Sequence, residues 1–145
     1  MTILLTNDDG YDADGICYLK SEIKKIEQTV TFAPRQNCSG YSAAISLGKD
    51  IEIEELNKDT FVISGTPADC SYFGLHGSKK FDFTQLVSGI NLGSNLGTDI
   101  FYSGTVGAAI AGLKLRYPPI AFSVASYQPK DLDFIAKKCA EICLY

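Results

Sequence analysis

The sequence predicts an α/β domain in which crossover helices connect the strands of a mostly parallel sheet. Short β-rich runs alternate with helical runs along the chain. The length of 145 residues, with 46% hydrophobic and 21% charged residues, is typical of one globular domain, so residues 1–145 are expected to form a single domain. Polar, glycine-rich loops follow three of the predicted strands, and ligands of open α/β sheets bind beyond those carboxyl ends.

Hydrophobic spacing predicts the individual elements in turn. Apolar and β-branched runs predict strands at 3–6, 29–33, 86–90 and 120–124, and a β-ribbon region over 45–47, 51–56 and 61–63. Apolar residues three and four apart predict two amphipathic helices, one through Ile16, Leu19, Ile23 and Ile26, the other through Leu132, Ile135, Ala136, Cys139, Ile142 and Cys143. A capping Thr, a Pro and an early carboxylate predict a third helix start at Thr66-Pro67-Ala68-Asp69, and the Ala- and Leu-rich run 106–115 predicts a fourth helix.

Charge and cysteine usage argue against several classes of protein. The net charge is −4 and the basic residues are scattered, which disfavours binding to long nucleic acid. The sequence has no run of 18 apolar residues, so we expect no membrane span. It shows no secretory leader, so we expect a cytoplasmic location. The five cysteines include no CxxC pair and the chain has a single histidine, which argues against zinc and disulfides. Cys70, Cys139 and Cys143 are predicted to be core residues.

The first candidate site is the turn Asn7-Asp8-Asp9-Gly10, directly after the first predicted strand. Two adjacent carboxylates repel each other, and a bound divalent cation would offset that repulsion. Mg²⁺ and Mn²⁺ prefer oxygen ligands of this kind. A plain turn in which an aspartate caps the next helix would also explain the motif, so the motif alone leaves both interpretations open.

Two further loops contain groups suited to phosphate. In the first, Ser39 and Gly40 would let a hydroxyl and the backbone approach a ligand closely, although such pairs are common in surface loops. In the second, the Asn- and Gly-rich segment 91–98 leads to Ser103-Gly104-Thr105 at a predicted helix start. Free backbone N–H groups, two hydroxyls and the helix dipole would form an anion pocket there, and the absence of Gly-Lys-Ser/Thr excludes a nucleoside-triphosphate P-loop.

Taken in order, these motifs resemble those of the SurE survival-protein nucleotidases. The resemblance extends from residue 3 to about residue 124 and is carried by Ile3-Leu4-Leu5-Thr6-Asn7-Asp8-Asp9-Gly10, Ala33-Pro34, Ser39-Gly40, Gly65-Thr66-Pro67-Ala68-Asp69-Cys70, Val87-Ser88-Gly89-Ile90-Asn91, Asn95-Leu96-Gly97 and Tyr102-Ser103-Gly104-Thr105-Val106. Each block is a modest signal, but the ordered set is specific.

The resemblance implies a Rossmann-like three-layer sandwich that hydrolyses nucleoside 5′- and 3′-monophosphates, and in some members short polyphosphate. It implies one divalent ion, Mg²⁺ or Mn²⁺, with the ligands Asp8, Asp9, Ser39 and Asn91. The phosphate would lie between that ion and Ser103, Gly104 and Thr105, with Gly40 and Asn95 lining the pocket. Such an ion would lower the pKa of a bound water, which Asp8 or Asp9 could orient, while Ser103 and Thr105 would stabilise charge on the phosphoryl group.

Length is the main departure from the family pattern. Family members continue well beyond residue 145 with a segment that includes a dimer-forming extension, so the C-terminal part of the family fold is expected to be absent. The homodimer or tetramer of the family is therefore an open question for this chain. A non-catalytic nucleotide- or phosphate-binding module is the alternative function: it would keep the anion pocket but would not need the Asp8–Asp9 pair. A purely structural domain would leave those carboxylates without compensation.

Overall fold

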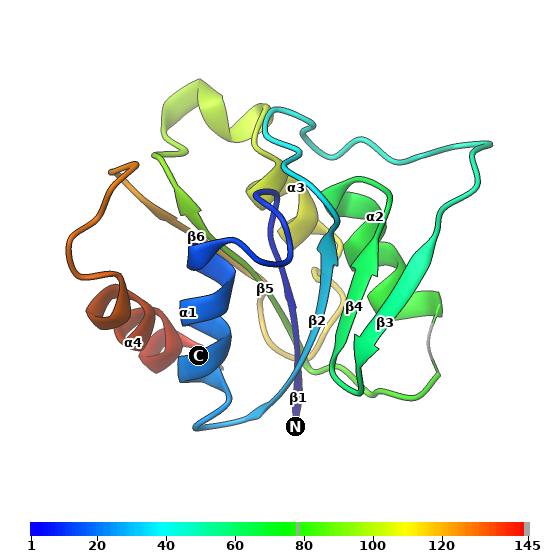
Figure 1. Ribbon diagram of the computed structural model, residues 1–145, viewed down its shortest axis with the longest axis horizontal. Helices are drawn as coiled ribbons and strands as arrows, with labels where there is room; N and C mark the ends of the chain where they lie inside the picture. The colour runs from blue at the N-terminus through cyan, green and yellow to red at the C-terminus, as the bar shows by residue number, and fades with distance from the viewer. Residues whose placement is uncertain (78, 144–145) are drawn as a thin grey trace.

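The computed structural model of the protein describes residues 1–77 and 79–143. Within these residues the chain forms a six-stranded sheet of order β3-β4-β2-β1-β5-β6, seen in Figure 1. The strands are β1 (Thr2–Thr6), β2 (Gln28–Pro34), β3 (Ile53–Asn57), β4 (Thr60–Ile63), β5 (Gln85–Leu92) and β6 (Ile120–Val124). All neighbours pair in parallel except β3, which runs antiparallel to β4 at the edge. The predicted mostly parallel sheet is confirmed.

Helices cover both faces of this sheet, which completes the predicted three layers. The helices α1 (Asp14–Ile23) and α4 (Leu132–Ile142) pack on one face, and α2 (Pro67–Tyr72) and α3 (Gly104–Ile110) pack on the other. The central strand β1 is buried along its whole length, as expected for a parallel strand covered on both sides. Its side chains alternate, so Ile3 and Leu5 join the cluster under α1 and α4, whereas Leu4 joins the cluster under α2 and α3.

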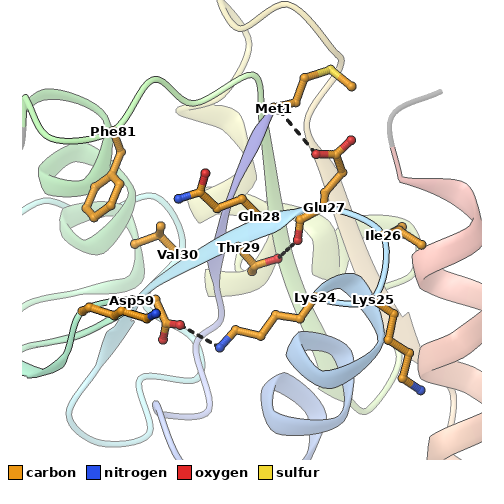
Figure 2. A pocket seen from close by; sticks show the side chains of 11 residues that line it. Met1, Lys24, Lys25, Ile26, Glu27, Gln28, Thr29, Val30, Asp59 and Phe81 are labelled. Atoms are coloured by element: carbon orange, nitrogen blue, oxygen red, sulfur yellow. Dashed lines mark hydrogen bonds and ion pairs between the residues drawn. The ribbon is translucent and has the colours of Figure 1, made fainter.

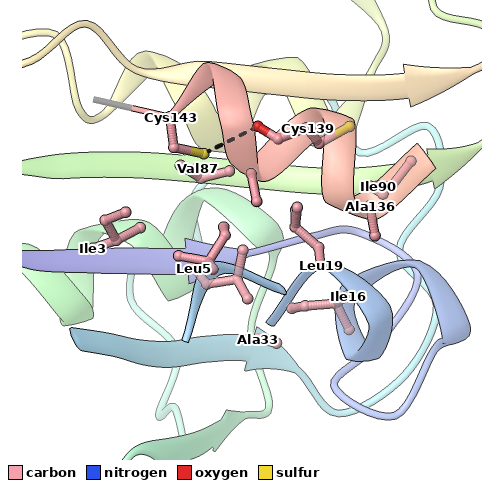
Figure 3. Close-up of a cluster of buried hydrophobic side chains, with 12 residues drawn as sticks. Ile3, Leu5, Ile16, Leu19, Ala33, Val87, Ile90, Ala136, Cys139 and Cys143 are labelled. Carbon is pink, nitrogen blue, oxygen red and sulfur yellow. Dashed lines mark hydrogen bonds between the residues drawn. The ribbon is translucent and has the colours of Figure 1, made fainter. Parts of the chain in front are cut away.

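The cluster under α1 and α4 is shown in Figure 3, where the apolar faces of the two helices meet the sheet. Ile16 and Leu19 of α1 and Ala136 of α4 are at most 1% exposed. Cys139 and Cys143 lie in the same cluster, and Cys70 is fully buried in the opposite one, which confirms these three thiols as core residues. Truncating a buried leucine such as Leu19 to alanine typically costs about 2–5 kcal/mol of stability.

The predicted helix start at Thr66 is confirmed by a reciprocal capping box. The Asp69 N–H donates to Thr66 Oγ1 over 3.1 Å, and the Thr66 N–H donates to Asp69 Oδ2 over 2.8 Å. The helix is short and continues as a π-helical turn at Phe73–Gly77 (η1), while a 3₁₀ turn at Gly97–Phe101 (η2) precedes α3. None of the helices in the described part of the chain is both long enough and apolar enough to cross a membrane.

Three predicted boundaries are wrong. Residues 45–47 are loop, because the preceding segment is tied to the capping box instead of to a strand: Thr66 Oγ1 donates to the Ala44 carbonyl, and the Ser46 N–H donates to Asp69 Oδ1. The helix predicted at 106–115 begins earlier and ends at Ile110. The first helix ends at Ile23, so Ile26 lies beyond it and is 53% exposed.

Candidate active site

Three loops meet at the carboxyl edge of the central strands: one after β1, one after β2, and one that connects β5 to α3. Together with a residue that follows β6 they enclose a cavity of about 350 Å³. The cavity is lined by Asp8, Asp9, Ser39, Gly40, Asn91, Leu92, Gly93, Ser94, Asn95, Asp99, Tyr102, Ser103 and Tyr127. Its position fits the general rule for ligand sites in open α/β sheets.

Asp8 leaves the end of β1 and is only 3% exposed. The Thr105 hydroxyl donates to Asp8 Oδ1 over 2.5 Å. The α3 helix approaches this carboxylate so closely that a Cβ on Gly104 would lie 2.8 Å from Asp8 Cβ, a distance that real Cβ contacts essentially never show. Burial raises the pKa of Asp8 above its usual range, and the bond from Thr105 opposes that rise only in part.

Asp9 lies beside it and is half-buried. Burial, and then the neighbouring Asp8 charge, raise the pKa of Asp9, while a backbone hydrogen bond from Leu92 and the bond from Asn37 Nδ2 act in the opposite direction. Both carboxylates are therefore in surroundings that disfavour their charged forms. No lysine, arginine or histidine among the described residues lines the cavity to compensate them.

The loop after β2 is fastened to these two carboxylates. The Cys38 N–H donates to the Asp8 carbonyl over 2.7 Å, and Asn37 Nδ2 donates to Asp9 Oδ1 over 3.2 Å. Asn37 Oδ1 accepts the Ser39 N–H over 2.9 Å. The opposite orientation of the amide would turn its oxygen toward the Asp9 carboxylate and lose both bonds. These contacts bring Ser39, on the loop after β2, to the carboxylate pair.

Asn91 lies at the carboxyl end of β5. Its Nδ2 donates to the Gly93 carbonyl over 2.8 Å, which leaves the amide oxygen to face a ligand. A similar bond closes the loop after β1, where Asn7 Nδ2 donates to the Gly10 carbonyl over 2.7 Å. Gly10 adopts a φ of +118°, so this tight turn requires glycine.

The four residues implied as metal ligands therefore line one cavity. Asp8, Asp9, Ser39 and Asn91 would offer carboxylate, hydroxyl and amide oxygens, the donor set that hard divalent cations prefer. In residues 1–77 and 79–143 no group of three or more His, Cys, Asp or Glu side chains is placed to hold a metal ion. The donor set thus fits Mg²⁺ or Mn²⁺ and does not fit a zinc site rich in thiolates or imidazoles.

The residues implied to bind phosphate divide into two groups. Gly40, Asn95 and Ser103 line the cavity. Asn95 Nδ2 donates to Ser123 Oγ over 2.7 Å, and Ser103 caps α3 by accepting the Val106 N–H. Gly104 and Thr105 do not line it: Thr105 is fully buried behind Asp8, and its hydroxyl is directed at that carboxylate.

Sequence reasoning missed four residues at this site. Asn37 links Asp9 to the Ser39 turn, and Asp99, Tyr102 and Tyr127 line the cavity. Asn37 lies two residues before Ser39, and Tyr102 is the first residue of the Tyr102-Ser103-Gly104-Thr105-Val106 block, so their positions could have indicated them. Tyr127 follows β6, far from every motif, and carried no such signal.

Comparison with known proteins shows the family and the fold of this chain. A family profile described as "Survival protein SurE" matches residues 3–144. The chain belongs to the SurE family. It is 42% identical to a "5'-nucleotidase SurE" of Acinetobacter baumannii over 94% of this chain and 59% of that protein. It is 45% identical to a "5'-nucleotidase SurE" of Acinetobacter baylyi over 92% of this chain and 52% of that protein.

A solved structure of the SurE protein from Aquifex aeolicus has the same fold. It superimposes with a TM-score of 0.90 at 38% identity and covers 98% of this chain and 58% of that one. The chain thus spans only 52–59% of the length of the SurE proteins named here. Family membership and fold are shared over nearly all of this chain.

Proposed function

We propose that this chain carries the site of a divalent-metal-dependent phosphomonoesterase that hydrolyses nucleoside 5′- and 3′-monophosphates to nucleoside and phosphate. The observation that carries the proposal is the adjacent Asp8–Asp9 pair, buried to different degrees in one cavity with Ser39 and Asn91 and lined by no cationic side chain of the described residues. The relatives named as 5′-nucleotidases support the substrate class.

The residues of this chain would have distinct roles in binding the metal ion and the phosphate. Asp8 and Asp9, with Ser39 and Asn91, would hold one Mg²⁺ or Mn²⁺ ion. When bound, such an ion neutralises phosphoryl oxygens and lowers the pKa of a coordinated water. Thr105 fixes the Asp8 carboxylate through its hydroxyl, so that this ligand is oriented before the ion arrives.

Phosphate contacts would come from other residues of the same cavity. Ser103, Asn95 and Gly40 line it and would offer hydroxyl, amide and backbone groups to the phosphoryl oxygens. Whichever of Asp8 and Asp9 is not fully engaged with the ion would accept the proton of the attacking water. Short polyphosphate would fit the same chemistry, since it presents the same terminal phosphoryl group. The dimer or tetramer implied by the family stays a prediction.

The first experiment measures phosphate release from 5′- and 3′-nucleoside monophosphates with Mn²⁺ or Mg²⁺, and then with EDTA. Release should require the ion and vanish in the double variant Asp8→Asn, Asp9→Asn. Asp131→Asn with Asp133→Asn is the matched control, because it makes the same change of charge at two exposed carboxylates near the start of α4. Absence of release from folded protein that binds Mn²⁺ would overturn the proposed activity and leave the alternative of a non-catalytic phosphate-binding module.

A further inference from the structure

Two tyrosine rings stand at the cavity that holds the carboxylate pair, and the chemistry described so far does not use them. Tyr102 is 69% exposed and Tyr127 is 83% exposed, yet both line the cavity together with Asp8, Asp9 and Ser103. Exposed aromatic side chains gathered at a polar pocket often mark a binding site, since each ring offers an apolar face and a polar tip.

Each ring lies next to a backbone segment that also carries a predicted site residue. Tyr102 immediately precedes Ser103, the cap of α3, and its backbone is held on both sides. Its N–H donates to the Asp99 carbonyl over 3.0 Å, and its carbonyl accepts the Ser42 N–H over 3.1 Å. The side chain is thus exposed although the backbone that carries it is fixed.

The other ring rests on the loop that carries a metal ligand. A Cβ on Gly93 would lie 2.9 Å from Tyr127 Cε1, so the ring lies against this glycine, two residues beyond Asn91. Gly93 is itself fixed, because its N–H donates to the Val124 carbonyl over 3.0 Å. One side of the Tyr127 ring is therefore supported by rigid backbone, and most of the rest is open.

The lining of the cavity changes character between these rings and its floor. The floor carries carboxylate, amide and hydroxyl oxygens, which suit a cation and a phosphate. The two tyrosines offer flat, uncharged faces, and no lysine, arginine or histidine of the described residues lines the cavity beside them. A ligand with phosphate at one end and a planar aromatic group at the other matches both parts.

We propose that Tyr127 and Tyr102 form a stacking platform for the nucleobase of the substrate; this inference rests on the proposed function, because it assumes that the phosphate lies on the carboxylate floor. Stacking uses the face that every base presents, so the platform favours nucleotides over other phosphate esters without selecting one base. The structure in this way assigns the nucleobase to two side chains, of which Tyr102 opens a family motif block and Tyr127 lies outside the motifs.

The test compares AMP with ribose 5-phosphate, which keeps the sugar and phosphate but lacks the base. In Tyr127→Leu the KM for AMP should rise about tenfold with kcat within about twofold of wild type, and the KM for ribose 5-phosphate should not change. Tyr102→Leu should act in the same direction. Tyr127→Phe should restore the wild-type KM, since it keeps the ring. Tyr18→Leu removes an exposed tyrosine on α1, outside the cavity, and is the control.

A binding measurement separates this inference from the proposed function. Binding of adenosine in the presence of EDTA is measured by saturation-transfer difference NMR of its base protons, with wild type and with Tyr127→Leu. Adenosine contact that is lost in the variant supports the platform even if wild type hydrolyses nothing, in which case only the proposed activity falls. Three results would overturn the platform and leave the proposed hydrolysis unaffected. They are an equal rise in KM for AMP and ribose 5-phosphate, unchanged kinetics in both leucine variants, and adenosine contact that persists in Tyr127→Leu.

Discussion

The central strands have a cavity at each end, and the acidic side chains of the two cavities differ in whether a cationic group lies beside them. The cavity at the amino end, whose lining side chains are drawn in Figure 2, has a volume of about 760 Å³, more than twice that of the cavity at the carboxyl end. It is lined by Met1, Lys24, Lys25, Ile26, Glu27, Gln28, Thr29, Val30, Lys58, Asp59 and Phe81. Among the described residues, both acidic and basic side chains line the larger cavity, whereas only acidic charged side chains line the smaller one.

At the amino end each acid has a cationic partner. Asp59 accepts from Lys24 over 2.7 Å and from Lys20 over 3.2 Å, and Glu27 lies 3.5 Å from the chain's amino group. Burial alone would raise the pKa of Asp59, but the bonds from Lys24 and Lys20 outweigh it and lower that pKa to about 2. Burial lowers the pKa of Lys20, and the nearby Asp59 charge opposes that decrease only in part.

At the carboxyl end the carboxylates of Asp8 and Asp9 have raised pKa values and no cationic neighbour among the described residues of the cavity. Charge balance, and not volume, therefore distinguishes the proposed site from the larger cavity. A cavity whose charges already neutralise each other needs no ligand, whereas an unbalanced pair is compensated when a cation binds.

The largest expected effect is stabilisation by the ion. Mn²⁺ at about 100 times its Kd should raise the free energy of unfolding by about 2.7 kcal/mol, because it binds the folded chain only. The increase should be absent from Asp8→Asn, Asp9→Asn and intact in Asp59→Asn, as measured by chemical denaturation with and without Mn²⁺. An equal increase in the double variant would place the ion elsewhere and remove the contrast between the two ends.

The next effect concerns the bond that fixes Asp8. Thr105→Val keeps the shape of a fully buried side chain but removes the donor to Asp8 Oδ1. We expect a loss of about 2 kcal/mol in metal-free stability and a weaker Mn²⁺ affinity, because a buried acceptor loses its partner. Thr105→Ser, which retains the hydroxyl, should keep the affinity. Calorimetric titration with Mn²⁺ of both variants checks this, and a valine variant with wild-type affinity would contradict it.

Much of the fold followed from local sequence patterns. The end of β1 could be predicted because the turn residues Asn7-Asp8-Asp9-Gly10 directly follow the strand. The Thr66 cap could be predicted because its partner, Asp69, lies only three residues later. The apolar stripe of α4 likewise predicted the buried positions of Cys139 and Cys143. In each case a short range of sequence contains the residues that interact.

The parts that could not be predicted depend on contacts between distant residues. The Asn37–Asp9 bond joins residues 28 apart, and the Tyr127 ring meets Gly93 only because β6 pairs with β5. The sequence placed Thr105 at a helix start but could not show that its hydroxyl points back toward Asp8. Loop 45–47 was mistaken for a strand because its apolar pattern is local, whereas the contacts that hold the loop come from α2.

A smaller effect is expected from the exposed bond between Asn37 and Asp9. Asn37→Ala should weaken Mn²⁺ binding about tenfold, the lower end for groups that orient metal ligands, with little change in metal-free stability. Asn37→Ser should behave like alanine, because a serine can still accept the Ser39 N–H but cannot reach Asp9. Gln36→Ala, on the same loop and also exposed, is the control. A serine variant with wild-type affinity would show that only the turn matters.

The smallest expected effect is a change in the free energy of unfolding that has opposite signs at the two ends of the strands. Asp59→Asn should lower the free energy of unfolding at pH 7 by about 1 kcal/mol once solvent screening is taken into account. Because the folded pKa of Asp59, about 2, lies below the ordinary value of 3.8, its contribution is present above pH 3.8 and is lost as the pH falls toward 2.

Asp9→Asn, without metal, should instead raise the free energy of unfolding at pH 7, since it removes the cost of burying the Asp9 charge and relieves the repulsion from Asp8. Denaturant unfolding of the two variants and wild type at pH 7 and again near pH 2 measures both signs. Two decreases at pH 7 would mean that the bonds from Asn37 and Leu92 already compensate Asp9 without an ion. The carboxyl end would then differ from the amino end in geometry and not in charge balance.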